Sequence, residues 1–153
     1  MSADNMAYEK LIAGCNAEKT GDFDLAASEY RTGLEYPTED FDIAYFMHNN
    51  LGFSLIQIGE YVEAEHFCRL AIKINPHRYN AHKNLGLALQ GQGQLIEAAL
   101  SLQIASVICS DPRAGRHLEE LLADHPEIRK HLKTFTVVEE PRPLTKGRSR
   151  MVH

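Results

Sequence analysis

Metal binding and thiol chemistry would have to come from eight histidines and three cysteines. Such sites place their ligands at short, fixed spacings, as in Cys-x-x-Cys or His-Glu-x-x-His, because one element must present two ligands to the same ion. Neither spacing occurs, and Cys15, Cys68 and Cys109 lie far apart in the chain. We therefore expect no metal site, no cofactor, and cysteines that stay reduced, with Cys15 as the one candidate for an exposed thiol.

Catalysis would need an arranged set of titratable groups or a phosphate-binding loop. The nucleophile motif Gly-x-Ser-x-Gly is absent. The glycines at positions 86, 91 and 93 fall in a helical pattern with no strand before them, which excludes a nucleotide-binding loop. We therefore expect that the protein is not an enzyme.

The length of 153 residues is that of one ordinary domain, and the shares of 44% hydrophobic and 24% charged residues are typical of a globular protein. No apolar stretch approaches the roughly 20 residues of a membrane-spanning helix, and the first residues lack the basic and apolar segments of a secretory signal. We expect a cytoplasmic protein that does not contact a membrane.

The net charge of −5 is distributed unevenly along the chain. Residues 1–44 hold 10 acids and 3 bases, a net charge of −7, whereas residues 134–153 hold 2 acids and 4 bases, a net charge of +2. A nucleic-acid-binding domain usually carries a broad basic face, which this distribution does not provide. We expect no nucleic-acid partner.

The chain contains an internal repeat of 34 residues. Residues 45–78 align without a gap on residues 79–112, with eleven identities where unrelated sequences would give about two. The identical pairs are Tyr45/Tyr79, His48/His82, Asn50/Asn84, Leu51/Leu85, Gly52/Gly86, Leu55/Leu89, Gly59/Gly93, Glu63/Glu97, Ala64/Ala98, Ala71/Ala105 and Ile74/Ile108.

Each repeat has the pattern of two short helices. In the first, apolar residues recur at helical spacing over 45–58, Gly59 interrupts them, and a second stripe follows over 61–74. Gly59 and Gly93 suit the left-handed end of a helix, while Gly52 and Gly86 allow the two helices to approach closely. Such a pair cannot bury its apolar stripe alone and must stack on copies of itself, which predicts an all-α solenoid.

The length and residue order of these units resemble the tetratricopeptide repeat (TPR) family. The matching residues in 45–78 are Leu51, Gly52, Gly59, Tyr61, Ala64, Ala71 and Pro76, and a more divergent unit fits 7–40. At the place of the family's Trp, the three units hold Lys10, His48 and His82. We expect the two histidines to pack within the fold and not to bind a metal. The resemblance implies a right-handed helical solenoid of three antiparallel helix pairs that binds other proteins.

The resemblance also predicts the domain organisation. A single domain would span 1–133, with repeats at about 7–40, 45–78 and 79–112 and capping helices at about 112–133. The acidic run at 39–42 would stabilise the N-terminus of a helix. The remaining residues, 134–153, are rich in proline, glycine and charge after a short β-prone segment, and we expect them to be disordered.

A second apolar stripe on the first helix of each unit has no partner within its own helix pair. The resemblance places this stripe in a concave groove, where a peptide or helix of another protein would bind. The predicted groove residues are Phe46, Asn49, Asn50, Phe53, Asn80, Lys83, Asn84 and Leu87, with Tyr8, Leu11 and Cys15 from the first unit. Exposed apolar surface with a polar rim favours the binding of a partner. The alternative is that a neighbouring helix or the chain's own tail covers this stripe.

Two roles remain open for such a module. One is an adaptor or scaffold, and the other is a small TPR-type chaperone of the kind found in bacterial secretion systems. One TPR subfamily binds acidic C-terminal tails through a two-carboxylate clamp of five polar and basic residues. Here only Asn50 matches, because the other places hold Leu11, Cys15, Asn80 and Asn84, so we expect a neutral or basic, partly apolar ligand anchored near Phe53. The oligomeric state stays open.

Overall fold

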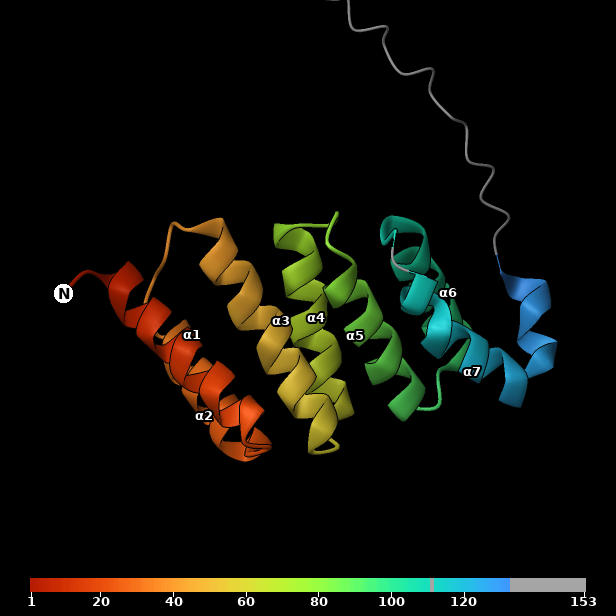
Figure 1. Cartoon of the computed structure of the whole chain (residues 1–153), viewed down its shortest axis with the longest axis horizontal. Coiled ribbons are helices and arrows are strands. Elements are labelled where there is room, and N and C mark those ends of the chain that lie inside the picture. Colours follow the sequence, from red (N-terminus) through yellow and green to blue (C-terminus); the bar gives the residue numbers. More distant parts are fainter. Residues whose placement is uncertain (111, 133–153) are drawn as a thin grey trace, which may run out of the picture.

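The computed structural model describes residues 1–110 and 112–132, and the tail predicted to be disordered lies outside these residues (Figure 1). Every regular element in the described part is helical, and none of its helices is long and apolar enough to cross a membrane. In chain order, the elements are α1 (Ala3–Lys19), α2 (Phe23–Leu34), α3 (Phe41–Gln57), α4 (Tyr61–Ile74), α5 (Tyr79–Gly91), α6 (Leu95–Ile108), the 3-10 turn η1 (Pro112–Gly115), α7 (Arg116–Asp124) and the 3-10 turn η2 (Pro126–His131).

The helices form three antiparallel pairs, α1/α2, α3/α4 and α5/α6, stacked along one axis (Figure 1). α1, α3 and α5 lie on one face of the stack, and α2, α4 and α6 lie on the other. η1, α7 and η2 pack on α6 at the C-terminal end. The predicted right-handed all-α solenoid of three helix pairs with a C-terminal cap is confirmed.

The turns inside the helix pairs depend on glycine. Gly59 and Gly93 have φ angles of +82° and +77°, the left-handed conformation that was predicted for them. After Gly59 the chain closes the turn with a hydrogen bond from the Glu60 N–H to the Leu55 carbonyl, 2.9 Å.

The start of α3 depends on its N-cap. One carboxylate oxygen of Asp40 accepts from the N–H groups of Asp42 and Ile43, at 2.9 and 3.1 Å. The predicted role of the acidic run at a helix N-terminus is confirmed. Because of this cap, α3 begins at Phe41, four residues before the sequence identity between repeats begins at Tyr45.

Two glycines permit the helices of a pair to touch. A Cβ atom on Gly52 would lie 2.6 Å from Cys68 Sγ, and one on Gly86 would lie 2.6 Å from Leu102 Cγ. Both distances are shorter than carbon and sulfur atoms tolerate, so a larger residue would force α3 from α4, or α5 from α6. Burial raises the pKa of the Cys68 thiol to about 12, which makes Cys68 an uncharged core residue.

The histidines in the family's tryptophan place are structural, as predicted. A ring nitrogen of His48 lies 2.7 Å from the Ala44 carbonyl oxygen, and one of His82 lies 2.8 Å from the Pro76 carbonyl oxygen. Each pairing satisfies a polar ring atom inside the stack.

Candidate functional site

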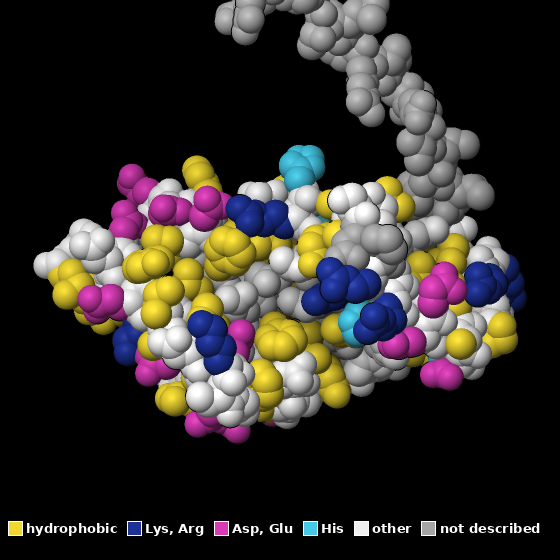
Figure 2. Space-filling model, viewed as in Figure 1, with side chains coloured by type: hydrophobic (Ala, Val, Ile, Leu, Met, Phe, Trp, Pro, Cys, Tyr) yellow, Lys and Arg dark blue, Asp and Glu magenta, His cyan; other side chains and the backbone are white. Residues whose placement is uncertain are grey.

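The face built by α1, α3 and α5, which we call the inner face, carries the second apolar stripe. Figure 2 looks onto this face and shows hydrophobic side chains gathered over α1 and α3. On α1, Tyr8 is 53% and Ile12 is 42% exposed. Phe53 of α3 and Leu87 of α5 are half-buried. The stripe therefore crosses all three repeats and keeps part of its apolar surface in water.

Two aromatic side chains of α3 have defined neighbours. Phe53 packs edge-on against Phe23 at the start of α2, with ring centroids 5.9 Å apart. Phe46 is covered on one side by the Arg78 guanidinium, which lies 4.8 Å from its ring centroid. Arg78 also donates to the Asp42 carboxylate at 2.8 Å. Phe53 therefore offers the more open aromatic surface of the two.

The predicted asparagines meet one another in a row across the helices. Asn84 Nδ2 donates to Asn49 Oδ1 at 3.0 Å, and Asn49 Nδ2 donates to Asn50 Oδ1 at 3.1 Å. Asn50 Nδ2 lies 3.6 Å from Cys15 Sγ. Asn49 is only 6% exposed and Asn84 only 3%, so both amides lie beneath the surface and hold α3 and α5 together. Asn50, which is half-buried, is the member of the row nearest to solvent.

The acceptor end of this row is unsatisfied. Asn84 Oδ1 is buried and has no hydrogen-bond partner among the described residues. The Lys83 side chain beside it in the sequence is half-buried, and this burial lowers its pKa. Asn80, one turn earlier on α5, is half-buried as well. The α5 part of the inner face is therefore polar, in contrast to the apolar α1 part.

A carboxylate network joins the first two repeats. Glu18 Oε1 accepts from Tyr30 Oη at 2.8 Å and from Ser54 Oγ at 3.1 Å. Burial raises the pKa of Glu18, although these two hydrogen bonds oppose the shift. Tyr30 Oη also lies 3.5 Å from Cys15 Sγ. Cys15, predicted as the candidate exposed thiol, is therefore half-buried between Tyr30 and Asn50 because it belongs to this network.

Sequence reasoning misplaced Leu11 and missed Ile12 and Arg78. Leu11, predicted to face the groove, is buried with 7% exposure, whereas its neighbour Ile12 is exposed. Ile12 stands at the same place in its unit as Asn50 does in the next, which was the available signal. Arg78 had no such signal, because its position over Phe46 depends on how α5 stacks on α3.

The described residues contain no group of three or more His, Cys, Asp or Glu side chains placed to hold a metal ion. The inner face offers apolar contact from α1 and α3, and amide and ammonium groups from α5. Hydrogen-bonding amides suit peptide groups, because each can donate and accept.

No family model matches the chain. Among curated proteins, it is similar to the Photosystem I assembly protein Ycf3 of Acaryochloris marina, with 25% identity over 99 residues. The similarity covers 65% of this chain and 59% of that protein, so the chain spans less than two thirds of its relative.

Solved structures of TPR domains resemble the chain closely in fold. The first TPR domain of human RPAP3 has a TM-score of 0.71 at 19% identity, covering 82% of this chain and 96% of that one. The TPR domain of Arabidopsis OM64 has a TM-score of 0.71 at 18% identity, covering 86% and 100%. The first TPR of Spaghetti (RPAP3), bound to the HSP90 peptide SRMEEVD, has a TM-score of 0.69 at 18% identity, covering 81% and 98%. The chain thus has the TPR fold with three repeats.

Proposed function

We propose that this three-repeat TPR solenoid is a non-catalytic adaptor that binds a segment of another protein on its inner face. The observation that carries the proposal is the set of apolar side chains Tyr8, Ile12, Phe53 and Leu87, which keeps water-exposed surface in every repeat. Exposed apolar patches with a polar rim usually mark interaction sites. Structures with the same fold support the class of ligand, since two of them hold the chaperone peptides SRMEEVD and SGPTIEEVD.

The ligand we propose differs in charge from those acidic peptides. The places where the resemblance puts a carboxylate clamp hold Leu11, Cys15 and Asn84, of which Leu11 and Asn84 are buried and none is cationic. Arg78, the cation over Phe46, already pairs with Asp42. The first 44 residues carry a net charge of −7. A neutral or basic segment with apolar side chains suits this face, with its anchor beside Phe53.

The anchor geometry supports one apolar side chain of the ligand against Phe53. Phe53 is held edge-on by Phe23, so its orientation is fixed before a ligand arrives. The half-buried Asn50 lies within the same repeat and offers an amide to the ligand backbone. A preordered aromatic anchor beside an amide favours an extended segment or one side of a helix.

Capture of partners on immobilised full-length protein tests the proposal. The test variant is Phe53→Glu on the inner face, and the matched control is Val62→Glu on α4, where Val62 is 74% exposed on the opposite face. We expect proteins retained by the wild type and the control to be lost from Phe53→Glu. Equal capture by all three chains would contradict a binding site on the inner face.

An adaptor differs from a general holdase chaperone in stoichiometry and specificity. An adaptor binds one kind of segment with a defined ratio, whereas a holdase suppresses aggregation of unrelated unfolded proteins. The inner face has polar groups at its α5 end, where Asn80 and Lys83 are half-buried, which favours the adaptor. Suppression of heat-induced aggregation of an unrelated enzyme, lost in Phe53→Glu, would favour the holdase instead.

A further inference from the structure

The outer surfaces of α4 and α6 differ although the two helices are equivalent in the repeat. Three places that hold exposed His66, Arg69 and Lys73 on α4 hold Leu100, Gln103 and Val107 on α6. At these three places α4 presents ionisable side chains to water, although Val62, its equivalent of Ile96, is apolar and 74% exposed. α6 has lost all three ionisable groups at equivalent places, so its outer surface is not an ordinary solvent face.

The outer surface of α6 carries a row of aliphatic side chains, which we call the outer stripe. Its members with their exposed fractions are Ile96 (42%), Ile104 (37%), Val107 (53%) and Ile108 (38%), together with the half-buried Leu100. Glu97 is the one ionisable residue within α6. A helix that is apolar both towards the core and outwards generally packs against a second surface.

We propose that the outer stripe is covered by the outer stripe of a second copy of this chain, with the two α6 helices antiparallel. The sequence of the stripe is symmetric: Ile96, Leu100, Ile104 and Ile108 are spaced by four residues around a midpoint at position 102. A two-fold axis at that midpoint brings Ile96 of one copy against Ile108 of the other, and Leu100 against Ile104. A two-fold interface requires such self-complementarity, because each copy presents the same patch.

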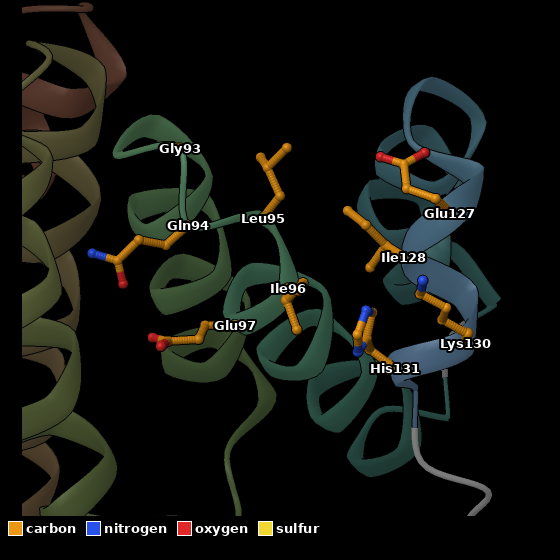
Figure 3. Close-up of a pocket in the computed structure, with 9 residues that line it drawn as sticks. All are labelled: Gly93, Gln94, Leu95, Ile96, Glu97, Glu127, Ile128, Lys130 and His131. Atoms are coloured by element: carbon orange, nitrogen blue, oxygen red, sulfur yellow. The ribbon is translucent and has the colours of Figure 1, made fainter.

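The shape of the surface at the start of α6 suits the same arrangement. A pocket of about 520 Å³ lies between the start of α6 and η2, and Ile96 belongs to both the pocket and the outer stripe. Figure 3 shows Ile96 and Ile128 pointing into this space from opposite sides, with His131 beside them. In the antiparallel pair, Val107 and Ile108 of the second copy lie at this end, beside the mouth of the pocket.

Charge also permits a second copy. With the axis at position 102, the two Glu97 carboxylates are roughly 15 Å apart along the helices at 1.5 Å per residue. This separation exceeds the Debye length of about 8 Å in physiological salt, so the carboxylates repel each other weakly. A pair formed through α4 would instead place Arg69 and Lys73 of both copies in one interface. The dimer does not depend on the proposed peptide binding, since the outer stripe and the inner face lie on opposite sides of the stack.

Sedimentation equilibrium of the full-length chain over a wide concentration range tests the dimer. We expect a reversible monomer–dimer equilibrium, in which the fraction of dimer rises with protein concentration. The test variant is Leu100→His with Val107→Lys, which installs the residues that α4 carries at the same places. The matched control is Val62→Lys, on the outer surface of α4. We expect the test variant to stay monomeric with unchanged circular dichroism, and the control to dimerise as the wild type does.

Three outcomes would overturn the proposal. One is a wild-type chain that remains monomeric at every concentration, as it would if its own tail covered the outer stripe. The second is a dimer that persists in the test variant, which would place the interface elsewhere. The third is equal loss of the dimer in the Val62→Lys control, because α4 lies outside the proposed interface.

Discussion

The contact between Gly52 and Cys68 provides a quantitative test of how the helix pair is packed. A methyl group at position 52 would meet Cys68 Sγ at 2.6 Å, whereas its next neighbours, the Ala64 carbonyl oxygen and the Cys68 nitrogen, lie at 3.4 and 3.5 Å. The sulfur is therefore the one atom that must move if Gly52 becomes alanine. Removing the sulfur by Cys68→Ala should make room for the added methyl group.

The magnitudes follow from two opposing effects. Overpacking against the sulfur costs about 1–3 kcal/mol, while replacing glycine by alanine inside a helix gains about 0.5–1 kcal/mol. Gly52→Ala alone should therefore lower the free energy of unfolding by about 0.5–2 kcal/mol. In a Cys68→Ala background the same change should raise it by about 0.5–1 kcal/mol, because only the helical gain remains.

Urea unfolding of the four chains, followed by circular dichroism, measures this double-mutant cycle. The thiol has a pKa of about 12 and is uncharged at neutral pH, so Cys68→Ala removes no charge. We expect a coupling energy of about 1–3 kcal/mol between the two substitutions. Additivity within about 0.5 kcal/mol would refute the contact and with it the fit of α3 on α4.

Three further predictions concern ligand charge, pH and thiol reactivity. The acidic peptide SRMEEVD should bind only weakly when its affinity is measured by calorimetry. Micromolar affinity that is lost in Lys83→Ala would contradict the proposed charge of the ligand. Burial raises the pKa of Glu18 above its usual value of 4.5, so the folded state favours the protonated carboxyl group. The free energy of unfolding of the wild type, relative to that of Glu18→Gln, should therefore fall as pH rises from 4.5 through the folded-state pKa. A difference between the two chains that does not change with pH would contradict this. Cys68 should react with a thiol reagent much more slowly than half-buried Cys15 in the native protein, and equal rates would contradict its burial.

The repeat and its turns could be predicted from the sequence because they depend on local rules. Gly59 is left-handed, Asp40 caps a helix, and Gly52 sits where two helices touch, and each of these roles requires a particular residue type. The 34-residue repeat then predicted that like units stack on one another, since units with the same apolar pattern bury equivalent stripes.

The depth of side chains on the inner face could not be predicted in the same way. Helical periodicity gives the direction of a side chain within its own helix, but exposure depends on how the next helix is rotated. Asn49 and Asn84 point towards the inner face as predicted and still lie beneath the surface, because Asn84 donates a hydrogen bond to Asn49 between α5 and α3. In the first unit, Leu11 stands at the place of Asn49 and is buried as Asn49 is, whereas Ile12, at the place of Asn50, is exposed and was not predicted.

Selection of peptides from a random displayed library on the full-length protein tests the central claim most directly. We expect enrichment of neutral or basic sequences with apolar residues, and loss of their binding in Phe53→Glu but not in Val62→Glu. Enrichment of acidic sequences, or binding that survives Phe53→Glu and is lost in Val62→Glu, would contradict binding of such a segment on the inner face.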